Sequence, residues 1–291
     1  MNTQLISRLS SIADSYDSYI IDLWGTLHNG VEPFPEAIDC LKKLKTAGKS
    51  IALLSNAPFR VDVVVKVITQ IGVPYDLYDN VLSSGEVAWN AIADRSNNLF
   101  ECLGKRVVFI GNERHRSMLE NPNIEEVNSI KQADFILCTG PRKQSHTIED
   151  YVSELSEAAN LSLPMVCANP DREVMRGQER EICAGAIADY YETTYKGVVS
   201  WYGKPFRPIF DEMITLLSYP QRNKVLMIGD GILTDVAGAK GADIDSLFLC
   251  GGIHADVLGV DKAGGVKETL LVELLRKYGQ APNYAAMHLS W

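Results

Sequence analysis

The chain has 291 residues, of which 46% are apolar and 22% are charged, and its formal net charge is -9. This length accommodates two domains of roughly 100–200 residues each, and the composition is that of an ordinary globular protein. The acidic balance argues against nucleic acid as a partner, because such a surface needs clustered Lys and Arg, and any anionic ligand requires a local site.

The N-terminal stretch MNTQLISRLSSIADSY shows no basic region followed by an apolar stretch of about 7–15 residues, so we expect no secretory signal. Its apolar spacing predicts instead one face of a short helix, formed by Leu5, Ile6, Leu9 and Ile12. No run of about 18 apolar residues occurs in the chain, which predicts that no helix spans a membrane.

Strands and helices alternate in the first third of the chain. The apolar runs YIIDLW (19–24) and IALLSN (51–56) are typical of buried parallel strands. Between them a helix is predicted from Pro35 to Gly48, and a second helix follows and ends at Gly72. This order implies right-handed crossovers and a parallel sheet that is covered on both faces.

The middle of the chain repeats the βα pattern. Three apolar runs predict strands with helical segments between them: KRVVFIG (105–111), ADFILCTG (133–140) and LPMVCANP (163–170). The clearest helix there covers 149–162. Near the C-terminus, KVLMIGDG (224–231) and IDSLFLCGG (244–252) predict two more short buried strands, and the Gly-rich stretch GGIHADVLG (251–259) is interpreted as a sheet-edge loop or a phosphate contact.

Cysteine usage bears on the cellular compartment. The six cysteines form no C-x-x-C pair and lie mostly within apolar runs: Cys40, Cys102, Cys138, Cys167, Cys183 and Cys250. Buried free thiols in a reducing environment explain this pattern best, so we expect a cytoplasmic protein.

Four polar side chains follow predicted strands, where ligands bind in an open parallel sheet: Asp22, Ser55, Lys204 and Asp230. A carboxylate at such a position can attack phosphorus and form an aspartyl-phosphate, and backbone N–H groups of LWGT, with Gly25 allowing a tight path, can bind phosphoryl oxygens. The hydroxyl of Ser55 and the ammonium of Lys204 can hold the remaining oxygens. Asp22 and Asp230, with a backbone carbonyl and waters, form the hard oxygen site that Mg²⁺ prefers. Each residue alone is common in ordinary turns, whereas the ordered set indicates phosphoryl chemistry.

The motifs IIDLWGTL, LLSN, GKP and MIGDGILTD resemble the four ordered motifs of the haloacid dehalogenase superfamily. The stretch CANPD and the context of GKP further resemble its class IIA branch, the group of 4-nitrophenylphosphatase-like and sugar- or nucleotide-phosphate phosphatases. The resemblance implies an α/β fold: a Rossmann-like parallel-sheet core (1–83 and 197–291) with an inserted α/β cap domain of the C2 type (84–196). Caps in this branch often mediate dimers, so the resemblance also suggests a homodimer that forms through the cap.

By this resemblance Asp22 is the nucleophile, and Ser55 and Lys204 contact the phosphate. Mg²⁺ would be bound by Asp22, the main-chain carbonyl of Trp24 and Asp230. The implied substrate is a small phosphorylated metabolite.

Four further residues have implied roles. Asp235 would orient Lys204 or a metal-bound water, and Asn56, next to Ser55, would face the phosphate. In the cap, Asn169 and Asp171 match a loop near the substrate. A Pro-anchored turn with Asp171 as a helix cap is an alternative interpretation of that loop.

The sequence departs from the family pattern at Trp24. Phosphatases of the family carry a second Asp there, which protonates the leaving group and then activates water, a contribution of roughly 10²–10⁴-fold. The indole N–H is only a hydrogen-bond donor and exchanges no proton at neutral pH. Trp24 is interpreted either as packing between core and cap or as a residue that shapes the substrate pocket.

Three hypotheses follow from the missing acid. The substrate has a leaving group that needs no proton, such as an acyl or aryl phosphate or a non-phosphate, dehalogenase-like substrate. Alternatively His28 supplies the proton, because the unperturbed pKa of histidine lies near 6.5; the other interpretation of His28 is a solvated or locally hydrogen-bonded side chain. Thirdly, the protein binds a phosphorylated ligand without turnover, as a sensor or partner module. We expect a Mg²⁺-dependent hydrolase, a phosphatase acting through an aspartyl-phosphate.

Overall fold

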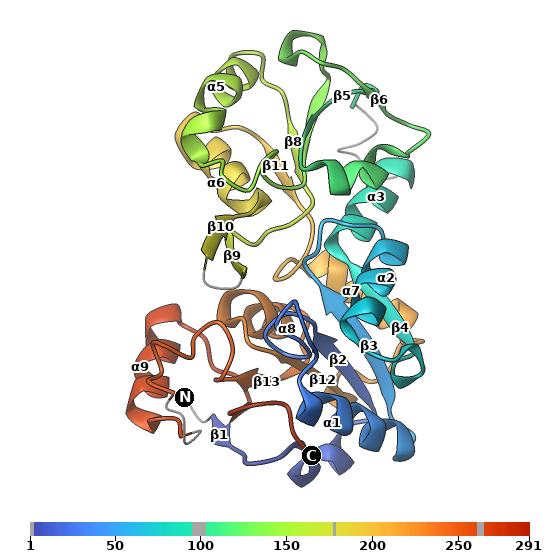
Figure 1. The fold of residues 1–291 in the computed structure, drawn as a ribbon, viewed down its shortest axis with the longest axis vertical. Coiled ribbons are helices and arrows are strands. Elements are labelled where there is room, and N and C mark those ends of the chain that lie inside the picture. Colours follow the sequence, from blue (N-terminus) through green and yellow to red (C-terminus); the bar gives the residue numbers. More distant parts are fainter. Residues whose placement is uncertain (1–2, 95–102, 177–178, 261–264) are drawn as a thin grey trace. The chain divides into compact units, whose positions relative to one another are not determined.

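The computed structural model describes residues 3–94, 103–176, 179–260 and 265–291, which form two compact units (Figure 1). Unit 1 contains Met1–Ser55, Val65–Leu82 and Lys204–Trp291. Unit 2 contains Asn56–Val64 and Ser83–Gly203. The core and cap boundaries expected from the sequence, at 83/84 and 196/197, stay a prediction.

Unit 1 is built on a seven-stranded sheet. In spatial order its strands are β1 (Gln4–Leu5), β14 (Tyr284–Ala286), β13 (Asp245–Leu249), β12 (Val225–Gly229), β2 (Ser18–Asp22), β3 (Ser50–Ser55) and β4 (Asn80–Ser83). All pairings from β1 to β3 are parallel. Every residue of the central strands β2 and β12 is buried, which is why both consist of apolar residues apart from Ser18 and Asp22 at the ends of β2 and Gly229 at the end of β12.

The register of the central strands brings three polar residues to one edge of the sheet. Asp22 at the end of β2 pairs with Leu54, so Ser55 follows one residue beyond this level on β3. Ile21 pairs with Ile228, so Asp230 leaves β12 at this edge as well. Because parallel strands share their carboxyl edge, these side chains lie at the place where open α/β sheets bind ligands.

Helices complete unit 1: α1 (Pro35–Thr46), α7 (Arg207–Leu216), α8 (Ala237–Gly241) and α9 (Glu268–Tyr278). The helix α2 (Val61–Ile71) is divided between the units, since its residues up to Val64 belong to unit 2 and those from Val65 belong to unit 1. A π-helical turn (Ile232–Val236) precedes α8. The predicted signals hold for α1, which begins with Pro35 and is followed by Gly48 in a left-handed conformation (φ +71°).

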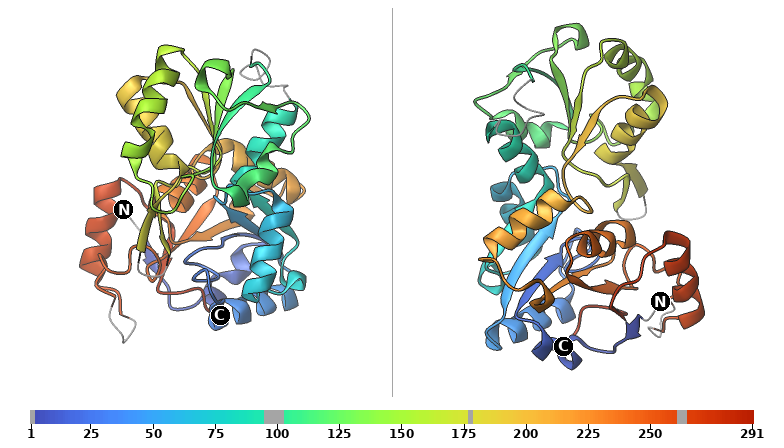
Figure 2. Two further views of the ribbon diagram at one scale, coloured as in Figure 1. Left: turned by 45° about the horizontal axis from the view of Figure 1, so that its top comes forward. Right: turned by 180° about the vertical axis from the view of Figure 1, so that it is seen from behind.

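Unit 2 contains a second, fully parallel sheet (Figure 2). Its order is β11 (Val199–Trp201), β8 (Met165–Cys167), β7 (Phe135–Cys138), β5 (Arg106–Ile110) and β6 (Glu125–Glu126). Among its described residues, unit 2 also contains an antiparallel strand pair and α-helices: β9 (Glu173–Arg176), β10 (Glu179–Ile182), α3 (Ser84–Asp94), α5 (Val152–Asn160) and α6 (Ala184–Tyr195). The predicted α/β class, with a Rossmann-like parallel sheet and a second parallel sheet, is confirmed.

Two local predictions are wrong. The N-terminal segment forms no amphipathic helix: Gln4 and Leu5 pair with β14, two short 3₁₀ turns follow, and Leu5 is exposed. Between β5 and β7 the expected helix is replaced by β6 and by 3₁₀ turns at Glu113–Leu119 and Ile130–Gln132. Pairing with a strand from the other end of the chain overrides the local apolar spacing at the N-terminus.

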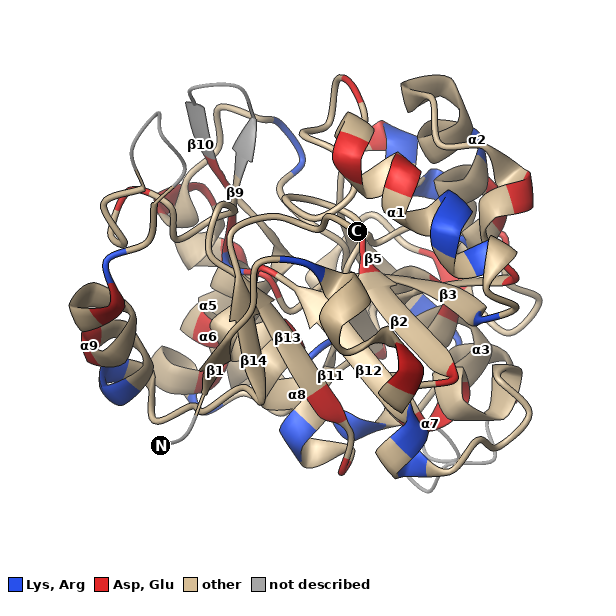
Figure 3. Ribbon diagram, turned by 90° about the horizontal axis from the view of Figure 1, so that it is seen from below, with Lys and Arg blue, Asp and Glu red and all other residues tan. Residues whose placement is uncertain are grey.

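Two expectations concern surface and membrane. In α1 and α9 the acidic residues lie toward the N-terminus of the helix and the basic residues toward its C-terminus (Figure 3), so neither helix carries charges of one sign only. Among the described segments, none is a helix with both the length and the apolarity that a bilayer crossing requires.

The cysteines outside 95–102 are buried free thiols, and Cys102 lies outside the described residues.

Candidate active site

The site in unit 1 is built around Asp22, the last residue of β2. Asp22 is only 7% exposed. Lys204 donates from Nζ to Oδ1 of Asp22 at 2.5 Å. The same ammonium lies 2.7 Å from Oδ1 of Asp235 and donates to the carbonyl of Leu54 at 3.2 Å. The structure therefore joins residues 182 positions apart in one buried ion cluster.

Burial and the neighbouring charges together set the pKa values in this cluster. Burial lowers the pKa of Lys204, but the carboxylates of Asp22 and Asp235 outweigh it, so the pKa is raised and the ammonium is retained. Burial raises the pKa of Asp22 well above its ordinary value; Lys204 opposes this, and Asp235 and Asp230 add to it. The cluster holds more negative than positive charge in a water-poor place, which is unfavourable without a further cation.

Asp230, immediately after β12, is enclosed by backbone. Its Oδ2 accepts the N–H of Ile253 at 2.7 Å. A Cβ atom added at Gly25 or at Gly252 would lie 2.0 Å from this oxygen, so both positions need glycine for a close approach. Gly25 also has a φ of +71°, the left-handed region that favours glycine. Two loops thus hold the carboxylate of Asp230 in place.

Asp22, Asp230 and Asp235 have the geometry of a cation site. All three are buried, and one carboxylate oxygen from each lies within 4.8 Å of those from the other two. Asp235 is fixed further, because its Oδ2 accepts the N–H of Gly231 at 2.9 Å. Oxygen ligands at this spacing fit a hard divalent cation, which would compensate the surplus negative charge.

We expect the Asp230→Asn variant to be more stable than the wild type in EDTA above pH 7. Burial, aided by the nearby Asp235 carboxylate, raises the pKa of Asp230 from 3.8 to about 7. The folded protein therefore keeps this proton at a pH where the unfolded chain has lost it, and stability falls as the pH rises toward 7. This difference in pKa corresponds to on the order of 4 kcal/mol.

Thermal unfolding between pH 4 and 9 measures this effect. The advantage of Asp230→Asn should be large at pH 8 and disappear near pH 4, where the wild type is protonated. Asp17→Asn, at an exposed carboxylate just before β2, serves as the control and should follow the wild type. An advantage that does not change with pH would contradict the electrostatic explanation.

The loop after Asp22 is folded around an aromatic pair. The ring of His28 contacts the half-buried indole of Trp24 edge to face, with centroids 5.5 Å apart. Gly30 lies under the indole, since a Cβ there would be 2.2 Å from Cη2 of Trp24. Trp24 is thus held by its own loop.

The buried hydroxyl of Thr26 in the same loop has no hydrogen-bond partner in the part of the chain that the structure describes.

His28 is buried and hydrogen-bonded within this loop. Its Nδ1 accepts the N–H of Gly30 at 3.0 Å, so of the two sequence interpretations the local hydrogen bond is present. Burial lowers the pKa of His28 to about 4. At neutral pH the ring carries no extra proton, which makes His28 a poor general acid.

Ser55 and Asn56 stand where the chain passes from unit 1 to unit 2. Ser55 is buried at the end of β3, one residue beyond Leu54, which pairs with Asp22. Asn56 begins a segment of unit 2 and donates from Nδ2 to Oδ1 of Asp171 at 2.8 Å. Asn169 accepts the N–H of Asp171 at 2.9 Å. The structure therefore brings Asn56, Asn169 and Asp171 together inside unit 2.

The alternative interpretation of residues 169–171 was a Pro-anchored turn in which Asp171 caps a helix. Asp171 caps no helix with its side chain, because α6 has Cys183 at its N-cap and no side-chain cap there. Instead the carbonyl of Asp171 accepts the N–H of Gly185 in the first turn of α6. The turn is thus tied to α6 by backbone and to residue 56 by the side chain.

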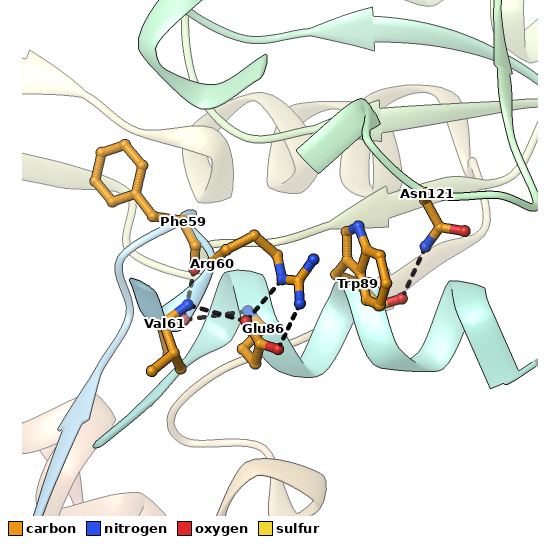
Figure 4. Close-up of polar contacts among 7 residues, drawn as sticks. Phe59, Arg60, Val61, Glu86, Trp89 and Asn121 are labelled. Atoms are coloured by element: carbon orange, nitrogen blue, oxygen red, sulfur yellow. Dashed lines mark hydrogen bonds and ion pairs between the residues drawn. The ribbon is translucent and has the colours of Figure 1, made fainter. Parts of the chain in front are cut away.

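The segment after Asn56 is bound to α3 (Figure 4). Arg60 donates from Nε and one Nη to the two carboxylate oxygens of Glu86 at 2.7 and 3.0 Å, and its guanidinium lies 3.6 Å from the ring centre of Trp89. Val61 adds its N–H to Glu86 at 2.9 Å. A bidentate, stacked arginine is a strong attachment, so residues 56–64 are part of unit 2.

Sequence reasoning missed the contribution of Ile253. Its backbone N–H carries no side-chain signature, and the Gly-rich stretch was interpreted without reference to Asp230. The available signal was Gly251-Gly252 directly after an apolar strand, because adjacent glycines often mark a close approach of backbone to another group.

Comparisons with known proteins give the family of the chain. The family Haloacid dehalogenase-like hydrolase matches residues 19–125, and the family HAD-hydrolase-like matches residues 201–287. A solved hydrolase of the haloacid dehalogenase-like family from Brucella suis 1330 is 32% identical, covers 98% of this chain and 100% of its own, and superposes with a TM-score of 0.83.

Two curated relatives are more distant. The 4-nitrophenylphosphatase of Schizosaccharomyces pombe (strain 972) is 21% identical, over 92% of this chain and 94% of its own. The 5'-nucleotidase YutF of Bacillus subtilis (strain 168) is 21% identical, over 82% of this chain and 89% of its own. Each of these similarities extends through both units.

Proposed function

The chain belongs to the haloacid dehalogenase superfamily, in the class IIA branch of 4-nitrophenylphosphatases and sugar phosphatases, and from this we propose that it is a Mg²⁺-dependent phosphatase acting through an aspartyl-phosphate. The observation that carries the proposal is the buried cluster in which Lys204 bridges Asp22 and Asp235. Asp230 lies close enough to both carboxylates for one cation to bind all three. The substrate would be a small phosphorylated metabolite.

Mg²⁺ would be held by Asp22, Asp230 and the main-chain carbonyl of Trp24, with Asp235 orienting Lys204 or a bound water. When bound, it would neutralise negative charge on the carboxylates and the phosphoryl group. The raised pKa values of Asp22 and Asp230 support this assignment, because they indicate a site that is short of positive charge.

In the proposed reaction Asp22 attacks phosphorus. Lys204 binds Oδ1, so Oδ2 forms the new bond to phosphorus while the bond to the leaving oxygen breaks. Lys204 and Ser55 then stabilise the phosphoryl oxygens, and the hydroxyl of Thr26 and the amide of Asn56 are further candidates for this role. Water attacks the phosphorus of the aspartyl-phosphate, which releases phosphate and restores the carboxylate.

The loop environment favours leaving groups that depart without a proton. Trp24 exchanges none at neutral pH, and the low pKa of His28 leaves its ring neutral. Aryl and acyl phosphates meet this condition, whereas alkyl phosphates do not. The same observation supports a second candidate function, binding of a phosphorylated ligand without turnover, as in a sensor or partner module.

We propose from the motif resemblance that Asn169 and Asp171 take part in substrate binding. Their turn is held by Asn56 and by α6. A homodimer through unit 2 stays a prediction. The buried free thiols of the described cysteines suit the reducing cytoplasm that we propose as its location.

We expect the purified protein to release phosphate from 4-nitrophenyl phosphate or acetyl phosphate in Mg²⁺, and to lose this activity in EDTA. Both substrates have leaving groups of low basicity, so the missing acid should not limit them. Phosphate release measured with and without Mg²⁺ tests the proposal. No release from a broad panel, together with tight binding of one phosphorylated compound, would support the binding function instead.

A further inference from the structure

The loop that follows β13 sets the position of Asp230. Ile253 in this loop donates the hydrogen bond to Oδ2 of Asp230, at 2.7 Å. Gly252 places its Cα against the same oxygen, since an added Cβ would lie 2.0 Å away. Any shift of these two residues would therefore move the carboxylate or leave it without its backbone donor.

The loop is fixed on the N-terminal side of Ile253 by its own backbone. Gly251 donates its N–H to the carbonyl of Met287 at 2.8 Å, which extends the pairing of β13 with β14. The ring of His288 fills the space beside Gly251, where a Cβ would lie 2.2 Å from Cε1. This attachment ends one residue before the contacts to Asp230 begin.

The loop is fixed on the C-terminal side by the ring of His254. The ring centroid lies 6.0 Å from that of Phe248 in β13 and 5.8 Å from that of Tyr278 at the end of α9. Burial, with a smaller contribution from Lys277, lowers the pKa of His254, so at neutral pH the ring is uncharged and packs as an aromatic group. Neither aromatic contact involves the cation cluster.

We propose that His254 is a positioning residue for the metal-binding carboxylate of Asp230, which it controls through the backbone N–H of Ile253. The inference rests on the proposed function in one respect, namely that Asp230 binds Mg²⁺. Partners outside the ligand set commonly change metal affinity by about 10–100-fold, although they never touch the metal. His254 differs from such partners in acting through a loop, not through a direct hydrogen bond.

Two variants test the role of the ring. His254→Gln removes the aromatic contacts but keeps a polar side chain, and should weaken Mg²⁺ binding by about 10–100-fold while exchange of the Ile253 amide hydrogen accelerates. His254→Phe keeps the ring, and should restore both values close to those of the wild type. Amide exchange is measured by NMR in the metal-free protein, and Mg²⁺ affinity by calorimetry.

Leu271→Ala is the matched control. Leu271 lies on α9 in the same buried apolar cluster as Phe248, so its truncation destabilises the fold. It should nevertheless leave the Mg²⁺ affinity and the Ile253 exchange relative to neighbouring amides unchanged. Unchanged exchange in His254→Gln, or faster exchange with unaltered Mg²⁺ affinity, would overturn the inference. A wild type that binds no Mg²⁺ would refute the proposed function, while the exchange data would still decide whether His254 positions the loop.

Discussion

The Asp22→Asn variant should release no measurable phosphate from any substrate that the wild type hydrolyses. An amide cannot form the aspartyl-phosphate, so the reaction loses its covalent step. We expect a loss of at least about 10⁴-fold in kcat, the scale on which removal of a covalent nucleophile acts in hydrolases. The variant should fold, because replacing a buried carboxylate whose pKa is raised by burial relieves an unfavourable charge.

Acid quenching followed by mass spectrometry provides the complementary measurement. Wild-type protein mixed with acetyl phosphate and Mg²⁺ should carry a phosphoryl group on Asp22, and the variant should carry none. Asp17→Asn, five positions earlier and exposed, should retain both the activity and the label. Hydrolysis that survives in Asp22→Asn would show that another group attacks phosphorus.

The sequence was sufficient to place Asp22 and Asp230 at one edge of a sheet. Both follow continuous apolar runs, and such runs indicate strands that are buried on both faces and therefore lie centrally in a parallel sheet. Central parallel strands end at a common edge, which brings their following residues close together. Lys204 was placed with them because it follows an apolar run, but that run is β11, a short edge strand of the sheet in unit 2, so strand position alone does not explain its contact with Asp22.

Other features depend on partners that no local pattern reveals. β1 exists because Gln4 pairs with Tyr284 at the opposite end of the chain. The pKa of His28 follows from its burial, which depends on how the whole loop folds back on Trp24, and spacing alone is compatible with a solvated ring. The same holds for Ile253, whose contribution comes entirely from its main chain.

The Trp24→Asp variant should gain about 10²–10⁴-fold in kcat on alkyl phosphates such as glycerol phosphate, the range of general acid–base catalysis. A carboxyl group at this position could give a proton to the departing alkoxide, which neither the indole nor the buried His28 does. Turnover of acetyl phosphate should change much less, because its leaving group departs without a proton. Steady-state kinetics on both substrates measure the difference.

Trp24→Asn is the control that separates proton transfer from space. Both substitutions remove the indole from Gly30 and His28 and leave a side chain of nearly equal size, but only the aspartate carries a titratable proton. An equal gain in both variants would mean that the indole excludes alkyl substrates by its bulk. No gain in either would mean that the leaving-group proton never limits the reaction. A gain confined to the aspartate would identify Trp24 as the residue that restricts this site to leaving groups of low basicity.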